Sequence, residues 1–322
     1  MKDIAQALKF VRGAVAKKDF VPEFTFFRIR DRKVQAYNGQ MSLCHPIDLD
    51  LDVAPKAKLF EAALNAVPED TPVSITVTQA QRLSIKAGKF RVLVACHMNI
   101  ADNFFPEPQG TRYEINLGLL EIFKDTLPFV AEDASRPWAR AIKLTGNSAY
   151  ATNNVVLVER WCPVAIPHEV VVPVDVVEQI VRMGVEPCAM QVSEGSVTFH
   201  FPNESWVRSQ LFADPWPNVA AVIDQPMNGL QPVPENFYED IKRLEKFITD
   251  NNTITLKGNV LSTTEAEGEG AHLEIPQALG DGKFHIKVLT KVASVATRVD
   301  FRNRPAVFAA KGLRGVAMPH GE

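Results

Sequence analysis

Two short stretches, Ile142-Lys143-Leu144-Thr145-Gly146-Asn147 and Ile254-Thr255-Leu256-Lys257-Gly258-Asn259, show that this chain repeats itself at an offset of 112 residues. A longer match without gaps aligns Val21–Asn38 with Arg136–Asn153, at an offset of 115 residues. A period of this length is too long for a solenoid, so the chain reuses a whole domain. Reused domains favour a symmetric assembly such as a ring.

Further marks extend the repeat. Thr152 aligns with Thr264, and the first two repeats close on Ala101-Asp102-Asn103-Phe104-Phe105-Pro106 and Ala213-Asp214-Pro215-Trp216-Pro217. A chain of 322 residues has room for three domains of ordinary size. The sequence therefore predicts domains over residues 1–108, 109–226 and 227–322.

The composition is that of an ordinary soluble globular protein. Hydrophobic residues make up 46% and charged residues 23%, and the formal net charge is −3. No apolar run is long enough to span a bilayer, and the N-terminus lacks the pattern of a signal peptide, so we expect a cytoplasmic protein without a membrane partner. The four cysteines form no Cys-x-x-Cys pair, as in a reducing compartment. The net charge near zero argues against a generally basic nucleic-acid-binding protein, but it does not exclude a protein with a basic face.

The hydrophobic pattern of the first repeat predicts a helix, three strands, a second helix and three more strands. Ile4, Leu8 and Val11 recur at helical spacing, while Lys9 falls on the opposite side. The stretch 47–53 alternates strictly between apolar and acidic residues, which predicts a strand. The order of elements predicts an α+β fold with helices on one face of antiparallel sheets.

The third repeat contains a second helix that we expect to run from Lys287 to about Arg298. Four apolar side chains recur there at helical spacing, and Lys287, Lys291 and Arg298 fall on the other face. The β-branched residues make a strand the alternative, but a period of two would mix lysines and valines on one face.

Four stretches carry a resemblance to a known family. Arg136–Ile142 corresponds to the family's Arg-Pro-x-Leu-Asn-Gly-Val, Ala151–Leu157 to Ala-Thr-Asp-Gly-His-Arg-Leu, Trp216–Asn218 to Phe-Pro-Asp, and Val316–Pro319 to Val-Val-Met-Pro. In these motifs and their order the chain resembles the bacterial DNA polymerase III beta sliding clamps. The resemblance implies three tandem clamp domains, with helices lining a channel and antiparallel sheets outside, closed into a ring as a head-to-tail dimer.

The chain also departs from the family pattern. Asn154-Val155-Val156 replaces Gly-His-Arg, Ala221 stands where an arginine is expected, and few residues precede the first helix. These departures indicate a divergent clamp, cellular or phage-encoded.

The resemblance implies a processivity factor that encircles duplex DNA, tethers a replicative DNA polymerase and is placed on DNA by a clamp loader. A ring holds DNA by enclosure, so its lining needs only lysines and arginines that meet phosphates without reading sequence. The candidates for this lining are Lys2, Lys9, Arg12, Lys18, Lys56, Lys58, Lys287, Lys291 and Arg298. The alternative is that these residues form the ordinary solvated faces of amphipathic helices.

The resemblance also implies a hydrophobic peptide-binding pocket for the polymerase. The matching positions are Ala139, Thr152, Asn154, Leu157, Pro217, Val222, Val316 and Met318. The alternative for Leu157, Val222 and Val316 is an ordinary place in the core. Phe105 matches an aromatic residue at the family's subunit boundary, and the alternative there is a lid over its own sheet.

Two enzyme or metal hypotheses remain open beside the clamp. Asp48, Asp50 and Asp52 would share one face of a strand and could hold Mg²⁺, and Cys44-His45 with Cys96-His97 could supply zinc ligands. Adjacent Cys and His residues point to opposite sides of a strand, which argues against the zinc site. We expect no catalytic residue, no metal and no cofactor. A third alternative is a clamp-fold scaffold or inhibitor that does not encircle DNA.

Overall fold

The computed structural model describes residues 2–18, 20–68, 71–98, 100–101, 103–133, 135–248, 252–263 and 270–321, without the side chain of Lys2. The chain packs as two compact units. Unit 1 is Met1–Leu120 with Asp175–Leu211, and unit 2 is Glu121–Val174 with Phe212–Glu322. The repeat marks Asp102 and Thr264 lie outside the described residues.

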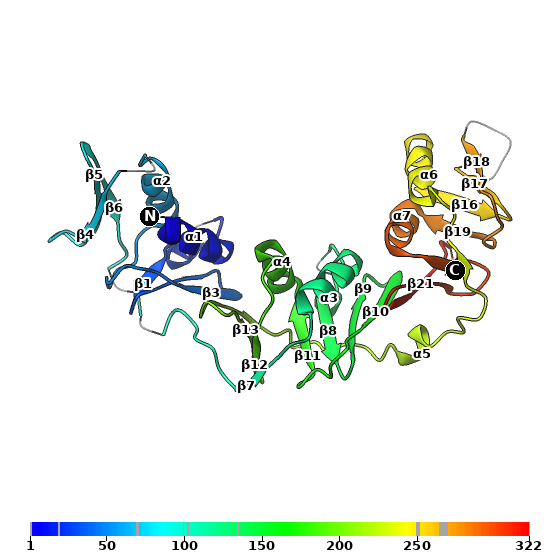
Figure 1. Cartoon of the computed structure of the whole chain (residues 1–322), viewed down its shortest axis with the longest axis horizontal. Coiled ribbons are helices and arrows are strands. Elements are labelled where there is room, and N and C mark those ends of the chain that lie inside the picture. Colours follow the sequence, from blue (N-terminus) through cyan, green and yellow to red (C-terminus); the bar gives the residue numbers. More distant parts are fainter. Residues whose placement is uncertain are drawn as a thin grey trace. The chain divides into compact units, whose positions relative to one another are not determined.

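Unit 1 combines helices with two antiparallel sheets (Figure 1). Its sheets have the orders β1-β2-β3-β14-β13-β12-β7 and β4-β5-β6. The elements are α1 (Lys2–Val11), η1 (Arg12–Ala14), η2 (Pro22–Thr25), β1 (Arg28–Arg30), β2 (Lys33–Tyr37), β3 (Met41–Pro46), α2 (Ala57–Asn65), β4 (Val73–Val77), β5 (Arg82–Ala87), β6 (Phe90–Ala95), β7 (Thr111–Glu114), α4 (Val174–Met183), β12 (Ala189–Ser193), β13 (Ser196–His200) and β14 (Trp206–Gln210).

Unit 2 has the same kind of architecture. Its sheets have the orders β11-β8-β9-β10-β22-β21-β20-β15 and β18-β17-β16-β19. The elements are α3 (Leu119–Thr126), η3 (Leu127–Phe129), η4 (Pro137–Arg140), β8 (Ala141–Thr145), β9 (Ser148–Thr152), β10 (Val156–Trp161), β11 (Val170–Pro173), α5 (Ala220–Ile223), β15 (Gln231–Pro232), α6 (Phe237–Leu244), η5 (Glu245–Phe247), β16 (Thr253–Lys257), β17 (Val260–Ser262), β18 (His272–Glu274), β19 (Gly282–His285), α7 (Ile286–Val295), β20 (Arg298–Asp300), β21 (Ala306–Ala310) and β22 (Leu313–Ala317).

Each large sheet joins strands that are far apart in the sequence. In unit 1, β3 pairs antiparallel with β14, and in unit 2, β10 pairs antiparallel with β22. Figure 1 shows α6 and α7 side by side next to the four-stranded sheet. Their inward side chains, among them Ile241, Leu289 and Val292, are almost fully buried. The expected α+β fold with antiparallel sheets is confirmed.

The predicted strand at 47–53 is wrong. That stretch is irregular apart from a single bridge between Ile29 and Val53, and the strand of this region is β3. The acidic residues of this alternating stretch form ion pairs instead of lining a strand face. Asp48 pairs with Arg32, and Asp52 pairs with Arg28 at 2.6 Å. Strand β3 is buried on both faces over its first four residues and therefore shows no alternation.

The predicted helix from Lys287 to Arg298 is too long. Helix α7 ends at Val295, and the next residue, Ala296, has an extended backbone. Arg298 instead lies on β20, which pairs with β15 and β21. Its guanidinium donates a hydrogen bond to the carbonyl oxygen of Leu230 at 2.8 Å. Arg298 therefore does not share a helix face with the two lysines.

Candidate functional site

An apolar row crosses the eight-stranded sheet of unit 2. Thr152, Leu157, Val316 and Val307 are cross-strand partners on β9, β10, β22 and β21. Partners in register lie on the same face of a sheet, so these side chains form one row. All four are at most 5% exposed. Leu157, Val307 and Val316 belong to one hydrophobic cluster.

The segment after Trp216 covers this row. Its short helix α5 packs on β10 and β22, and it places Ile223, not Val222, in the cluster with Leu157 and Val316. Ile223 is 2% exposed, whereas Val222 is 44% exposed. A single helical turn can point only one of two neighbouring side chains inward. The sequence missed Ile223, although it directly follows the motif-matched Val222.

A polar row lies beside the apolar one on the same sheet. Glu159 on β10 pairs in register with Tyr150 on β9 and Arg314 on β22. Its carboxylate accepts hydrogen bonds from Arg314 Nε at 2.5 Å, Ser148 Oγ at 2.6 Å and Tyr150 Oη at 2.8 Å. Burial alone would raise the pKa of Glu159, but these hydrogen bonds and the charge of Arg314 lower it. Glu159 is therefore held ionised where β10 meets β22.

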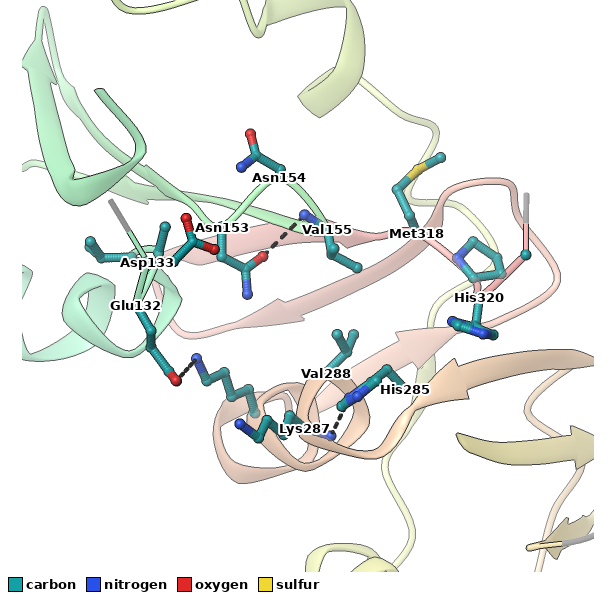
Figure 2. Close-up of a pocket in the computed structure, with 15 residues that line it drawn as sticks. Glu132, Asp133, Asn153, Asn154, Val155, His285, Lys287, Val288, Met318 and His320 are labelled. Carbon is teal, nitrogen blue, oxygen red and sulfur yellow. Dashed lines mark hydrogen bonds and ion pairs between the residues drawn. The ribbon is translucent and has the colours of Figure 1, made fainter. Parts of the chain in front are cut away.

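A pocket of about 540 Å³ lies within unit 2, and Figure 2 shows its lining. Four segments form it: residues 130–133, the loop around Asn154, the start of α7, and the chain after β22 that carries Met318 and His320. Asn153 Oδ1 accepts hydrogen bonds from the amides of Val155 and Val156, at 3.1 and 2.8 Å. Asn154 has a φ of +73°, a conformation that asparagine tolerates better than most residues. This loop exposes Val155 at the pocket.

The pocket combines apolar side chains with charges of both signs, because Glu132 and Asp133 line it beside Lys287 and Lys291. Lys287 is exposed, and Lys291 forms an ion pair with Glu132 at 3.5 Å. His285 caps α7, because its Nδ1 accepts a hydrogen bond from the amide of Lys287 at 3.2 Å. Burial, followed by the nearby charges of His320 and Lys287, lowers the pKa of His285. The cap therefore favours the neutral imidazole.

The predicted pocket residues separate into two groups. Asn154 and Met318 line the pocket of Figure 2, where Met318 is 39% exposed and its amide donates to the Val155 carbonyl at 2.8 Å. Leu157, Val316, Thr152 and Ala139 are buried, Pro217 is partly exposed, and Val222 is exposed. Their peptide-binding role stays a prediction.

The predicted DNA-facing residues also separate. Lys9, Arg12 and Lys58 line a cavity in unit 1, while Lys287 and Lys291 line the unit 2 pocket. Lys18 and Lys56 lie over the rings of Phe20 and Phe26, with Nζ 5.7 and 5.9 Å from the centroids. The side chain of Lys2 lies outside the described residues. Contact of these residues with DNA stays a prediction.

Phe105 is 4% exposed within the chain itself, and its ring centroid lies 5.3 Å from that of Phe104. Phe104 in turn contacts Phe24 and Tyr37. This burial fits the lid interpretation, and the role at a subunit boundary stays a prediction.

The acidic and cysteine-histidine patterns gather into no metal site. Among the described residues, no group of three or more His, Cys, Asp or Glu side chains could hold a metal ion. Asp48 and Asp52 are paired with arginines. Burial raises the pKa of the Cys44 thiol to about 12 and also raises the pKa of Cys96, so neither is poised as a thiolate.

Comparison with solved structures identifies the fold. The sliding clamp (DNA polymerase III subunit beta) of Pseudomonas aeruginosa bound to griselimycin superposes with a TM-score of 0.81 over 100% of this chain and 98% of that chain, at 15% identity. The chain has the fold of a bacterial beta sliding clamp. The clamps of Caulobacter crescentus and Bacillus subtilis match at TM-scores of 0.82 and 0.81, both at 16% identity, over 99% and 100% of this chain and 97% of each of theirs.

The match confirms the resemblance found in the sequence at the level of the fold. No protein-family model and no curated protein sequence matches the chain. None of the described helices is both long and apolar enough to cross a membrane.

Proposed function

We propose that this protein is a DNA sliding clamp, a non-catalytic processivity factor that encircles duplex DNA and tethers a replicative DNA polymerase. The observation that carries the proposal is the clamp fold, which extends over the whole chain and nearly the whole of each clamp compared. The order of helices and strands supports three clamp domains over 1–108, 109–226 and 227–322. Two copies would then close a six-domain ring in the cytoplasm, with a clamp loader to open it.

The first test is the assembly and its retention on DNA. Light scattering across a dilution series should give a stable mass of two chains. The protein should stay on nicked circular duplex DNA at high salt and should leave the same DNA after linearisation, because enclosure resists salt and charge contacts do not. Loss from circular and linear DNA at the same rate would refute the proposal.

The polymerase tether is proposed for the exposed apolar surface around the pocket of unit 2. Val155 and Met318 are 40% and 39% exposed, so changing both to alanine should leave the core intact. A loss of buried apolar contact should weaken polymerase binding roughly tenfold. The matched control is Val164→Ala, an equally conservative change at a residue that is 51% exposed in the same unit. Equal polymerase stimulation by the double variant and the control would contradict this site.

One observation keeps a second function in view. The loop at 154–156 lacks the Gly-His-Arg residues of the family motif and presents Val155 instead. A clamp-fold scaffold or inhibitor binds replication proteins without enclosing DNA. Such a protein would use the altered pocket for binding and would not need to close into a ring. It predicts a monomer or open assembly, so the light-scattering measurement separates it from the clamp.

A further inference from the structure

We propose that a groove in unit 1, formed by α1, α2 and α4, binds an unpaired nucleotide of single-stranded DNA. The base would lie on the apolar floor, and its phosphates would meet the cationic rim. This inference rests on the proposed function, because it takes DNA as the ligand. It adds to that function a site for the single strand beside a duplex.

The groove in unit 1 is formed by specific contacts between its helices. Its cavity volume is about 800 Å³, within the range of small-molecule sites. One wall forms where α4 meets the end of α1, and Gln179 Nε2 donates to the carbonyl oxygen of Phe10 at 3.2 Å. Gly13 permits this approach, because a Cβ there would lie 2.3 Å from Gln179 Oε1.

The rim is strongly positive. Five cationic side chains line the groove, against the single carboxylate of Glu61. They are Lys9, Arg12, Lys17, Lys58 and Arg182. Arg12 lies 3.7 Å from Glu61 but keeps 72% of its side chain exposed. Such a surplus of positive charge attracts the phosphates of a nucleic-acid strand.

The floor offers rings on which a base can stack. The half-buried ring of Phe10 lies 5.1 Å from that of His45 and 6.2 Å from that of Phe201, between centroids. Val185, which is 44% exposed, extends the apolar surface. Asn203 Nδ2 lies 3.2 Å from His45 Nε2 and adds polar atoms at the edge. Aromatic rings beside a cationic groove are the arrangement that binds single strands without reading sequence.

The combination favours an unpaired nucleotide over the alternatives. A duplex presents phosphates to the rim, but its bases are stacked and reach the floor only after costly unstacking. An acidic peptide matches the rim charge but gains no base stacking from Phe10. The single strand uses both the rings and the charge.

The test is the fluorescence anisotropy of a short labelled oligothymidylate. We expect Phe10→Leu to raise its Kd about tenfold, since stacking on an aromatic ring is worth ~1–3 kcal/mol per base. Val185→Ser, at an exposed position, removes apolar surface without adding charge, so it should weaken binding without touching the core, and it covers the case in which Phe10→Leu fails to fold. Lys17→Glu with Lys58→Glu should raise the Kd and flatten its salt dependence. The control is Lys89→Glu, an exposed lysine outside the groove that should change nothing.

Two results would overturn the inference. One is an unchanged Kd in both Phe10→Leu and Val185→Ser alongside a loss in the lysine variant, which would leave a plain electrostatic surface. The other is an oligoglutamate peptide of equal charge that displaces the oligonucleotide equally well. A short linear strand cannot be held by enclosure, so its binding does not depend on ring closure. If the protein is not retained on circular DNA but still binds oligothymidylate, the clamp proposal is refuted and the groove proposal stands. If it is retained on circular DNA but does not bind oligothymidylate, the groove proposal is refuted and the clamp proposal stands.

Discussion

Replacing Glu159 with glutamine tests whether the polar row holds β10 against β22. The substitution keeps the size of the side chain and removes its charge. Glu159 is 14% exposed, and Arg314 is 38% exposed. The variant removes the ion pair of Arg314 with Glu159, and the remaining ion pair of Arg314, to Asp224, is longer at 3.5 Å. The variant therefore weakens the link between two strands that are more than 150 residues apart in sequence.

The expected cost follows from the three hydrogen bonds to the carboxylate. A hydrogen bond to a charged group contributes ~1.5–3 kcal/mol, and removing one partner of a fully buried ion pair costs ~3–5 kcal/mol. The partly exposed Arg314 regains water, and the glutamine oxygen still accepts from a hydroxyl. We expect Glu159→Gln to lower the free energy of unfolding by about 2 kcal/mol.

The pH dependence provides a second reading of the same interaction. The folded-state pKa of Glu159 is lowered, so the carboxylate stabilises the fold above its ordinary pKa of 4.5. That contribution is lost as the pH falls through the lowered folded-state value. The difference between the wild type and Glu159→Gln should therefore shrink below about pH 4.5.

Urea unfolding followed by tryptophan fluorescence measures the effect, since Trp138, Trp161 and Trp216 report on unit 2. Hydrogen exchange of peptides from β10 and β22 localises it. The matched control is Glu169→Gln, whose carboxylate is 59% exposed and pairs with Lys143 at 3.0 Å, and we expect a change below ~1 kcal/mol. Equal costs for the two variants, or no loss of protection in β10, would refute the reasoning.

Three further predictions follow from individual contacts. Leu157→Ala should destabilise unit 2 by ~2–4 kcal/mol in urea unfolding, because it empties part of the buried cluster. Lys287→Glu with Lys291→Glu should shorten retention on circular DNA while leaving the melting temperature unchanged, and unchanged retention would remove both from the DNA-facing set. Burial, reinforced by the charge of Arg112, lowers the pKa of His200 to about 4, so stability should fall as the pH drops from about 6.5 to 4. His200 is only half-buried, so the loss should be ~1–2 kcal/mol, and His200→Gln should flatten the pH profile.

The sequence predicted the elements whose one face meets water. Helix α1 buries Ile4, Leu8 and Val11 and exposes Lys9, as the predicted helical spacing requires. The prediction from hydrophobic periodicity failed where burial on both faces removes the alternation of a strand, or where ion pairs produce an alternation without a strand. Strand β3 is buried on both faces, and the stretch 47–53 alternates because Asp48 and Asp52 pair with arginines. Hydrophobic periodicity shows which side chains face water. It cannot distinguish a strand from an irregular segment whose alternate side chains form ion pairs at the surface.

The sequence predicted which segments form the candidate site, but not which of their side chains contact one another. The motif around Leu157 located the apolar row, yet which neighbour enters the cluster, Val222 or Ile223, depends on how one turn of α5 sits on the sheet. The cap of α7 by His285 was missed because histidine is not a typical N-cap residue. Arg182, which is not among the predicted DNA-facing residues, joins the unit 1 groove through the packing of α4 on α1.

The distribution of charge argues that unit 1 carries more of any DNA contact than unit 2. Lys291 already pairs with Glu132, and Lys287 lines a pocket with the exposed apolar residues Val155 and Met318, so both lysines are also placed to meet a peptide. The rim of the unit 1 groove has five cations against one carboxylate. Partner binding would then use residues of unit 2 and DNA contact residues of unit 1. A polymerase peptide bound in unit 2 would leave the DNA contacts of unit 1 unchanged.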